Sequence, residues 1–232
     1  MKYDRVIQGT FIERPNRFIA NVRIKGEGDM PDPVVRCHVK NTGRCRELLV
    51  PGAEAYLSVS DNPSRSTRYD LIAVQKGNRL INMDSQIPND VAEEDLRRIP
   101  FFSSVETITR EYRYGNSRID LMASEGERRY LIEVKGVTLE NDGVVSFPDA
   151  PTERGAKHVR ELIGCMRDGY IPCLLFVIEM DDVRYFEPAR AIDPAFSDAL
   201  KEAKDAGVNI FAYSCDVTPD SMSLKDPVEV RI

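Results

Sequence analysis

The stretch Arg118-Ile-Asp-Leu-Met-Ala-Ser-Glu-Gly-Glu-Arg-Arg-Tyr-Leu-Ile-Glu-Val-Lys-Gly136 places two short apolar runs on either side of a polar turn that contains glycine. This pattern is typical of a β-hairpin. Side chains alternate along a strand, so Glu133 and Lys135 leave the same face of the second strand. If the strands pair about the turn, Asp120 of the first strand comes alongside Glu133. The stretch therefore predicts two carboxylates and an ammonium group at one point on a sheet.

This cluster suits a divalent cation and a phosphodiester. Mg²⁺ favours oxygen ligands and keeps several waters, so Asp120, Glu133 and the carbonyl oxygen of Val134 suffice to anchor Mg²⁺ or the similar Mn²⁺. Lys135 would orient or deprotonate the attacking water and stabilise charge on the phosphate. The alternative is an edge salt bridge, because a lone Glu-x-Lys triplet carries little information. With Asp120 and the surrounding element order added, we predict a metal site with Asp120, Glu133 and Lys135 as catalytic residues.

The first 87 residues consist mainly of strand-like runs separated by turns. Strands are expected over residues 6–12, 18–24, 34–39, 53–60, 69–75 and 79–82, with Glu13–Arg17 as the first turn. Thr42 or Asn41 would cap a short helix that Pro51-Gly52 ends. Three strands, a short helix and further strands is the order of an OB-fold barrel. We therefore predict an OB-fold-like nucleic-acid-binding domain over residues 1–87.

Residues 88–232 alternate helices and strands after a boundary at Gln86-Ile-Pro-Asn-Asp90. Asn89, Thr152 and Asp193 are expected to cap three helices that end near Arg98, Met166 and Gly207. Strands are expected over residues 108–114, the two arms of the hairpin, 171–180 and 208–213, with loops at 141–143 and 147–151. The run at 171–180 is apolar throughout, as in a buried central strand.

The order of these elements is α-β-β-β-α-β-α-β, with the acidic cluster on the second and third strands. It resembles the core of the PD-(D/E)XK nucleases in both topology and motif placement. The resemblance implies a nuclease-like α/β domain with a mixed central sheet over residues 88–232.

Basic residues in both halves are candidates for binding nucleic acid. On the helix after the hairpin, Arg154, Lys157 and His158 are spaced i, i+3, i+4 and share a face. If this face looks toward the acidic cluster, these residues would grip phosphates; otherwise they form a solvated stripe. His158 is expected to be a phosphate or structural hydrogen-bond donor rather than a metal ligand. In the front half the candidates are Arg14, Arg17, Lys40, Asn41 and Arg44.

Two further sets of residues each have two interpretations. Phe11 and Phe18 would be stacking platforms for single-stranded nucleic acid, although aromatic residues in such strands more often form the barrel core. Glu106 and Glu111 would add an acidic metal ligand, although exposed acids are more often simply solvated.

Composition limits the class of protein. Net charge is −6, which argues against indiscriminate coating of nucleic acid, but residues 1–87 carry a net +4 and residues 88–232 a net −10. No apolar run approaches the roughly 18 residues needed to span a bilayer, and the N-terminus lacks an apolar signal region, so we expect a cytoplasmic protein without membrane contact. Five cysteines without a CxxC pair, and only two histidines, predict buried free thiols rather than a zinc site.

Several sequence blocks, in one order from about residue 9 to the C-terminus, resemble the sugar fermentation stimulation protein A (SfsA) family. They are Arg17–Val22, Asn41–Gly43, Glu47–Gly52, Ser60–Asn62, Tyr114-Gly115, Ser117–Asp120, Ile132–Leu139, Phe147–Gly155 and Lys157-His158. The resemblance implies an N-terminal OB-like domain, a C-terminal nuclease-like domain, and a DNA-binding protein linked to the regulation of sugar utilisation. Asp120, Glu133 and Lys135 show no departure from this pattern.

Three hypotheses follow. The first is a Mg²⁺- or Mn²⁺-dependent nuclease acting on DNA, with RNA as an open alternative. The second is a DNA-binding regulator that keeps the nuclease architecture without useful catalysis. The third is a two-domain protein whose acidic residues are structural. DNA binding is common to the first two hypotheses, and the form of the nucleic acid and the oligomeric state stay open.

Overall fold

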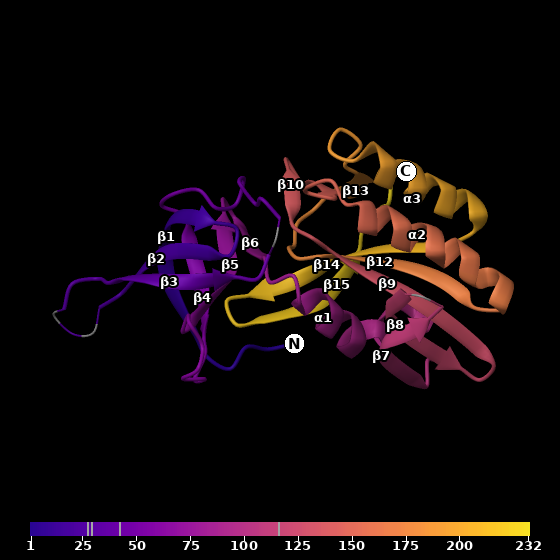
Figure 1. Ribbon diagram of the computed structural model, residues 1–232, viewed down its shortest axis with the longest axis horizontal. Helices are drawn as coiled ribbons and strands as arrows, with labels where there is room; N and C mark the ends of the chain where they lie inside the picture. The colour runs from indigo at the N-terminus through magenta and orange to yellow at the C-terminus, as the bar shows by residue number, and fades with distance from the viewer. Residues whose placement is uncertain (27, 29, 42, 116) are drawn as a thin grey trace.

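The computed structural model describes residues 1–26, 28, 30–41, 43–115 and 117–232, which form a β-barrel joined to an α/β unit (Figure 1). The barrel strands are β1 (Val6–Asn16), β2 (Ile19–Ile24), β3 (Val34–Val39), β4 (Glu54–Val59), β5 (Tyr69–Lys76) and β6 (Arg79–Asn82). They are ordered β3-β2-β1-β4-β5-β6, and a parallel pairing of β3 with β5 closes the barrel. The predicted OB fold is confirmed.

Two local predictions in the barrel need correction. The first turn lies at Arg17-Phe18, because β1 continues to Asn16; two bulges opposite β2 accommodate Pro15, which has no amide to donate. The short helix expected before Pro51 is wrong, because the chain makes a turn there around Cys45, whose φ is +45°.

The loop that replaces the predicted helix is held by Arg14. Its guanidinium donates to the carbonyl oxygens of Asn41, Gly43 and Arg44, at 2.8–2.9 Å. The guanidinium thereby satisfies backbone carbonyls that lack helical partners in this loop. Of the two expected caps, Asn41 accepts the Gly43 amide with its own side chain, and Thr42 lies outside the described residues.

The α/β unit is built on a mixed sheet of order β15-β14-β12-β9-β8-β7. Its strands are β7 (Thr107–Tyr114), β8 (Ser117–Glu125), β9 (Arg128–Val137), β12 (Ile171–Ile178), β14 (Asn209–Thr218) and β15 (Ser221–Pro227). The helices are α1 (Ile87–Asp95), α2 (Glu153–Cys165) and α3 (Pro194–Ala206), with short 3₁₀ helices at Leu96–Arg98, Pro100–Phe102 and Met166–Asp168. α2 and α3 lie side by side on one face, and α1 lies on the other (Figure 1).

Strand β12 shows why the sheet is covered on both faces. Leu174 and Phe176 belong to the core on the α2 and α3 side, whereas Cys173, Leu175 and Val177 belong to the core that includes α1. All five side chains are fully buried. The apolar run at 171–180 therefore follows from burial on two faces, as predicted.

The ends of two helices follow local signals in the sequence. The Thr152 hydroxyl accepts the Gly155 amide at 3.0 Å, and the Asp193 carboxylate accepts the Phe196 amide at 2.9 Å. Gly207, with φ of +95°, ends α3 in the left-handed region that glycine tolerates. These caps confirm the predicted starts of α2 and α3.

The predicted cap of α1 is wrong. Asn89 lies inside the helix, which starts at Ile87 with Pro88 in its first turn, a position that proline favours. The Asp84 carboxylate accepts the Gln86 amide at 3.2 Å just before the helix. The side chain of Asn89 is thereby free for the contact described below.

Four strands of the α/β unit were not anticipated. The loop expected at 141–143 is the turn of a hairpin formed by β10 (Leu139–Asn141) and β11 (Val144–Phe147), and β13 (Tyr185–Pro188) pairs with β11 in a small second sheet. The fourth is β15, which extends the main sheet beyond β14. β10, β11 and β13 are only 3, 4 and 4 residues long, too short to show a hydrophobic period. In β15 the buried Met222 and Leu224 alternate with polar residues, a strand pattern that the prediction missed.

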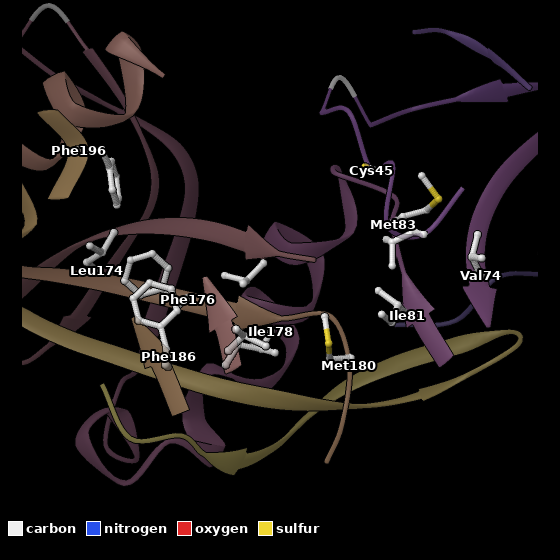
Figure 2. Packing of buried hydrophobic residues seen from close by; sticks show 14 of the residues in the cluster. Cys45, Val74, Ile81, Met83, Leu174, Phe176, Ile178, Met180, Phe186 and Phe196 are labelled. Carbon is white, nitrogen blue, oxygen red and sulfur yellow. The ribbon is translucent and has the colours of Figure 1, made fainter. Parts of the chain in front are cut away.

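An apolar core runs from the barrel into the α/β unit. Figure 2 shows Ile81 and Met83 of the barrel near Ile178 and Met180 at the end of β12, and all four are fully buried in one cluster. The N-terminal residue also reaches across, since the Met1 ammonium group donates to the Met222 carbonyl oxygen at 3.1 Å. The two units are thus packed against each other through a shared core.

The cysteines behave as predicted. Cys37, Cys45, Cys165, Cys173 and Cys215 are all buried and free. Burial raises the pKa of the Cys165 thiol to about 11, with the Asp168 charge adding to the effect. Such thiols pack as small apolar groups rather than reacting.

Candidate functional site

The hairpin of β8 and β9 brings the predicted carboxylates together. Its register pairs Leu121 with Ile132, so the next residues along the two strands are Asp120 and Glu133. The turn lies at Gly126, whose φ is +55°. Lys135 projects from the same face as Glu133, and its Nζ lies 2.5 Å from Glu133 Oε1. The predicted cluster is confirmed in its geometry.

The two oxygens of the buried Glu133 carboxylate have different environments. Oε1 accepts hydrogen bonds from Lys135 Nζ and from His158 Nδ1, each at 2.5 Å. Oε2 is buried and has no partner among the described residues. Burial opposes ionisation of Glu133, but the bonds from His158 and Lys135 outweigh it and lower the pKa of this carboxyl. Glu133 therefore favours its ionised form, and its Oε2 is available to a ligand.

Asp120 is held from two sides. Its Oδ2 accepts the Val134 amide at 2.8 Å, and its Oδ1 accepts the Asn89 side-chain amide of α1 at 3.1 Å. Burial and the neighbouring charge of Glu133 raise the pKa of Asp120, against the opposing effect of Lys135. A divalent cation between Asp120 and Glu133 would remove this repulsion.

Helix α2 carries predicted phosphate-binding residues to the cleft. Thr152, Arg154, Gly155 and His158 line the same hollow as Asp120 and Glu133. Arg154 Nε donates to His158 Nε2 at 3.3 Å, so His158 carries its proton on Nδ1 and donates it to Glu133. The amino terminus of α2 also lies at this hollow, and helix amino termini attract anions. Of the predicted i, i+3, i+4 face, Arg154 and His158 thus lie toward the acidic cluster.

The other candidates of the α/β unit lie further out. Lys157 is exposed and 3.6 Å from Glu161, but it lines a neighbouring hollow with Arg118, Arg154 and His158. Glu111 is exposed and paired with Arg118 at 3.0 Å, and Glu106 is exposed. Neither acid is placed with Asp120 and Glu133 as a third carboxylate.

The barrel candidates divide into two groups. Arg14 is committed to backbone carbonyls, and Lys40 Nζ lies 2.8 Å from buried Asp84 and 3.6 Å from Asp70, so both cations serve internal contacts. Arg17 and Arg44 are exposed.

The two barrel phenylalanines also differ. Phe18 is 44% exposed with the Arg17 guanidinium 4.7 Å from its ring centre, whereas Phe11 is buried. Arg17 with Phe18 is therefore the pair that offers a stacking surface, and Phe11 is core.

The residues present fit a hard divalent cation. Within the described ranges, no three His, Cys, Asp or Glu side chains gather as a ready-made metal cage. Mg²⁺ sites commonly need only one or two carboxylates together with waters and substrate phosphates. Asp120, the unpartnered Glu133 Oε2 and Val134 at the wall of the cleft provide such a partial set.

Two residues of the cluster have roles that the sequence alone did not reveal. Asn89 was interpreted as a helix cap, yet it binds Asp120; His158 was expected to bind phosphate or serve as a structural donor, and it is Glu133 that it contacts. These contacts link residues 31 and 25 positions apart. The sequence indicated these roles only through a polar side chain on the side of an amphipathic helix that faces the core.

Comparison with known proteins identifies the family. Residues 86–221 match the family described as "Sugar fermentation stimulation protein RE domain", and residues 12–83 match "SfsA N-terminal OB domain". The chain belongs to the SfsA family. Similar relatives include the "Sugar fermentation stimulation protein homolog" of Clostridium beijerinckii, 50% identical over 99% of each chain. That of Desulfitobacterium hafniense (strain DSM 10664 / DCB-2) is 49% identical over 100% of this chain and 99% of the relative.

A solved SfsA structure supports the same fold. It is described as "The structure of Pyrococcus Furiosus SfsA in complex with Ca2+" and matches with a TM-score of 0.87 and 28% identity. The match covers 100% of this chain and 98% of that one. As for membranes, none of the helices within the described residues has the length and apolar character to cross one.

Proposed function

We propose that this SfsA protein binds nucleic acid and hydrolyses its phosphodiester bonds with Mg²⁺ or Mn²⁺. The observation that carries the proposal is the buried, unpartnered Oε2 of Glu133 beside Asp120, in a cleft that also holds Lys135. The Pyrococcus furiosus relative, described as a Ca²⁺ complex, supports an oxygen-ligand cation in this fold.

Each residue of the cluster has a defined task. Asp120 and Glu133 would hold the cation, which when bound supplies charge neutralisation for the phosphate and a more acidic water. His158 and Asn89 fix the orientation of these carboxylates through their hydrogen bonds. Lys135 lies with its ammonium group 2.5 Å from Glu133 and would donate to the attacking water or to a phosphate oxygen.

Nucleic-acid binding would use the rim of this cleft and the barrel. Arg154, with the amino terminus of α2, would bind the scissile phosphate, and Arg118 with Lys157 the next one. Arg17, Phe18 and Arg44 of the barrel would hold the strand further away. DNA is the expected substrate, and RNA is assayed beside it.

The test is cleavage of supercoiled, linear and single-stranded DNA and of RNA in Mg²⁺ and in Mn²⁺. Wild type should cut at least one substrate, and Lys135→Ala should lower the rate by at least a hundredfold. A matched control is Lys201→Ala, whose exposed ammonium group on α3 pairs with Asp205 and lies outside the proposed binding residues. Survival of every substrate with wild type and both ions would refute turnover.

A second candidate, a DNA-binding regulator without catalysis, is favoured by one observation. Lys135 already compensates the charge of Glu133 and His158 donates a hydrogen bond to it, so the carboxylate is stable without a cation. This protein would bind DNA in a salt-dependent way, and the binding would survive Lys135→Ala but weaken with Arg17→Ala or Arg44→Ala. The relatives' link to sugar fermentation would then reflect control of expression. Binding without salt dependence would contradict it.

A further inference from the structure

A second cavity lies beside the candidate metal site, between the barrel and the α/β unit. Asn41 and Gly43 of the barrel form one wall, and the ends of β9, β11 and β12 form the other. It shares Ser85, Phe147 and the segment Val134–Gly136 with the cleft that contains Asp120 and Glu133. Gly136 lies three positions after Glu133 in β9, about 10 Å along the strand. The two hollows are therefore adjacent parts of one groove.

Glu179 is the unusual residue of this cavity. It follows β12, is 1% exposed, and its Oε2 has no hydrogen-bond partner within the described part of the chain. Its carboxyl lies directly on Gly136, where a Cβ atom would come within 2.4 Å of Oε1. Burial, with a further contribution from the Asp84 charge, raises the pKa of Glu179 well above its ordinary value. This environment favours the neutral carboxyl, which offers one O–H donor and one carbonyl acceptor.

A second carboxyl group of the cavity, that of Asp149, packs against the barrel. Asp149 Oδ2 is buried without a partner among the described atoms, and it packs against Gly43 so closely that a Cβ atom there would lie 1.8 Å away. Both glycines therefore leave room for a carboxyl group at the cavity wall. Two buried oxygens without partners are costly unless a ligand or water satisfies them.

The chemistry of the lining indicates the occupant. Asn41, Thr138 and Ser146 add an amide and two hydroxyl groups to the carboxyls of Asp149 and Glu179. Hydrogen-bond donors and acceptors around a small space suit a neutral ring with N–H and carbonyl groups.

Shape and size agree with such a ring. Half-buried Phe147, packed on Phe196 with ring centres 5.0 Å apart, lines both hollows and offers an aromatic surface. The cavity volume of about 200 Å³ is below the roughly 300–1,000 Å³ of pockets for drug-sized ligands, so it admits one base and not a stacked pair.

We propose that this cavity binds a single unstacked nucleobase whose own phosphate lies at Asp120, Glu133 and Lys135. The inference rests on the proposed nuclease function and specifies its substrate class as single-stranded nucleic acid. Glu179 and Asp149 read the hydrogen-bonding edge of the base, as in enzymes that take a base out of its stack. A base engaged in a duplex cannot present this edge, so paired nucleic acid is a poor substrate.

The test uses wild type and ten-nucleotide fluorescent single strands in which one abasic residue replaces each nucleotide in turn. Binding is measured by anisotropy in Ca²⁺. Loss of the base at one position should weaken binding about tenfold, the effect of one stacked and hydrogen-bonded base, and loss at distant positions far less. The blunt duplex of the same sequence should bind at least tenfold more weakly. Equal binding of all abasic strands, or of duplex and single strand, would overturn the proposal.

Two variants connect the effect to the cavity. Thr138→Val removes a lining hydroxyl with little change in shape and should reduce the position-specific penalty, whereas Thr109→Val on exposed β7 should leave it intact. Cleavage assays in Mg²⁺ and Mn²⁺ separate the two levels of the proposal. Cleavage that ignores the abasic position refutes the base cavity and leaves the nuclease; a position-specific binding penalty without cleavage refutes turnover and supports the cavity.

Discussion

Glu133 and Glu179 are two buried glutamates on neighbouring strands of one groove, and their environments are opposite. Both have a buried Oε2 without a partner among the described residues. Glu133 receives hydrogen bonds from Lys135 and His158, which lower its pKa despite burial. No cation among the described residues offsets the burial of Glu179, and the charge of Asp84 lies near it, so its pKa is raised.

The difference shows how one residue type serves two kinds of chemistry. An ionised carboxylate with a free oxygen suits a cation, and a neutral carboxyl suits a hydrogen-bonding ligand. Both side chains are almost equally buried. The charged groups near each carboxyl therefore decide the direction of its pKa shift. Four predictions test this contrast.

The largest effect is expected for metal binding. Mg²⁺, Mn²⁺ or Ca²⁺ at 100 times its Kd should stabilise wild type by about 2.7 kcal/mol, since it binds only the folded state. Glu133→Gln should abolish the stabilisation, whereas the matched change Glu179→Gln should retain it. Thermal unfolding with and without the ion measures both. Equal stabilisation of the two variants by the ion would refute the proposed difference between Glu133 and Glu179.

The next effect concerns His158, which positions Glu133. His158→Ala should lower metal affinity by about 10–100-fold, the usual cost of losing a hydrogen bond behind a ligand. His158→Asn should recover part of it, because its amide can donate from nearly the position of Nδ1. Calorimetric titration with Mn²⁺ measures the affinities. An unchanged affinity in His158→Ala would assign the histidine to structure alone.

The two glutamates should also give opposite pH effects on stability. The raised pKa of Glu179 stabilises the folded state at low pH, and this contribution is lost as pH rises from about 4.3 toward the folded value, by up to about 1.4 kcal/mol per pH unit. Glu179→Gln should remove this loss. The lowered pKa of Glu133 acts in the other direction, so its contribution is lost as pH falls below about 4.3.

Urea unfolding of wild type and both glutamine variants between pH 3 and pH 8 tests the two signs. The advantage of Glu179→Gln over wild type should grow with pH, and the deficit of Glu133→Gln should shrink only in acid. Parallel pH curves for wild type and Glu179→Gln would show that Glu179 is ionised in the folded state.

The smallest effect is expected for Arg154. Arg154→Ala removes an exposed donor to His158 Nε2, so metal affinity should change less than about threefold. If Arg154 binds a phosphate, the salt dependence of single-strand binding should fall by about 0.7 in logarithmic slope. Anisotropy titrations at several salt concentrations measure the slope. An unchanged slope would place Arg154 outside the nucleic-acid path.

Much of the candidate site was predictable because it is local. The pairing of Asp120 with Glu133 follows from a short turn and from the two-residue period of strands, and Lys135 follows from the same period. Thr152 and Asp193 cap their helices through residues only three positions away. The continuous apolar run of β12 predicts that this strand is buried.

The remaining contacts depend on how separate elements pack. The sequence alone determined the alternation of side chains along the two strands of residues 118–136. It also determined the helix caps near residues 152 and 193. Packing of α1 and α2 on opposite faces of the sheet brought Asn89 to Asp120 and His158 to Glu133. Packing also explains why Arg14 binds backbone carbonyl groups and not phosphates, because the loop that contains Gly43 and Arg44 folds over its side chain. Distant partners and local dielectric arise only when the chain is packed, so tertiary structure decided the opposite pKa shifts of Glu133 and Glu179.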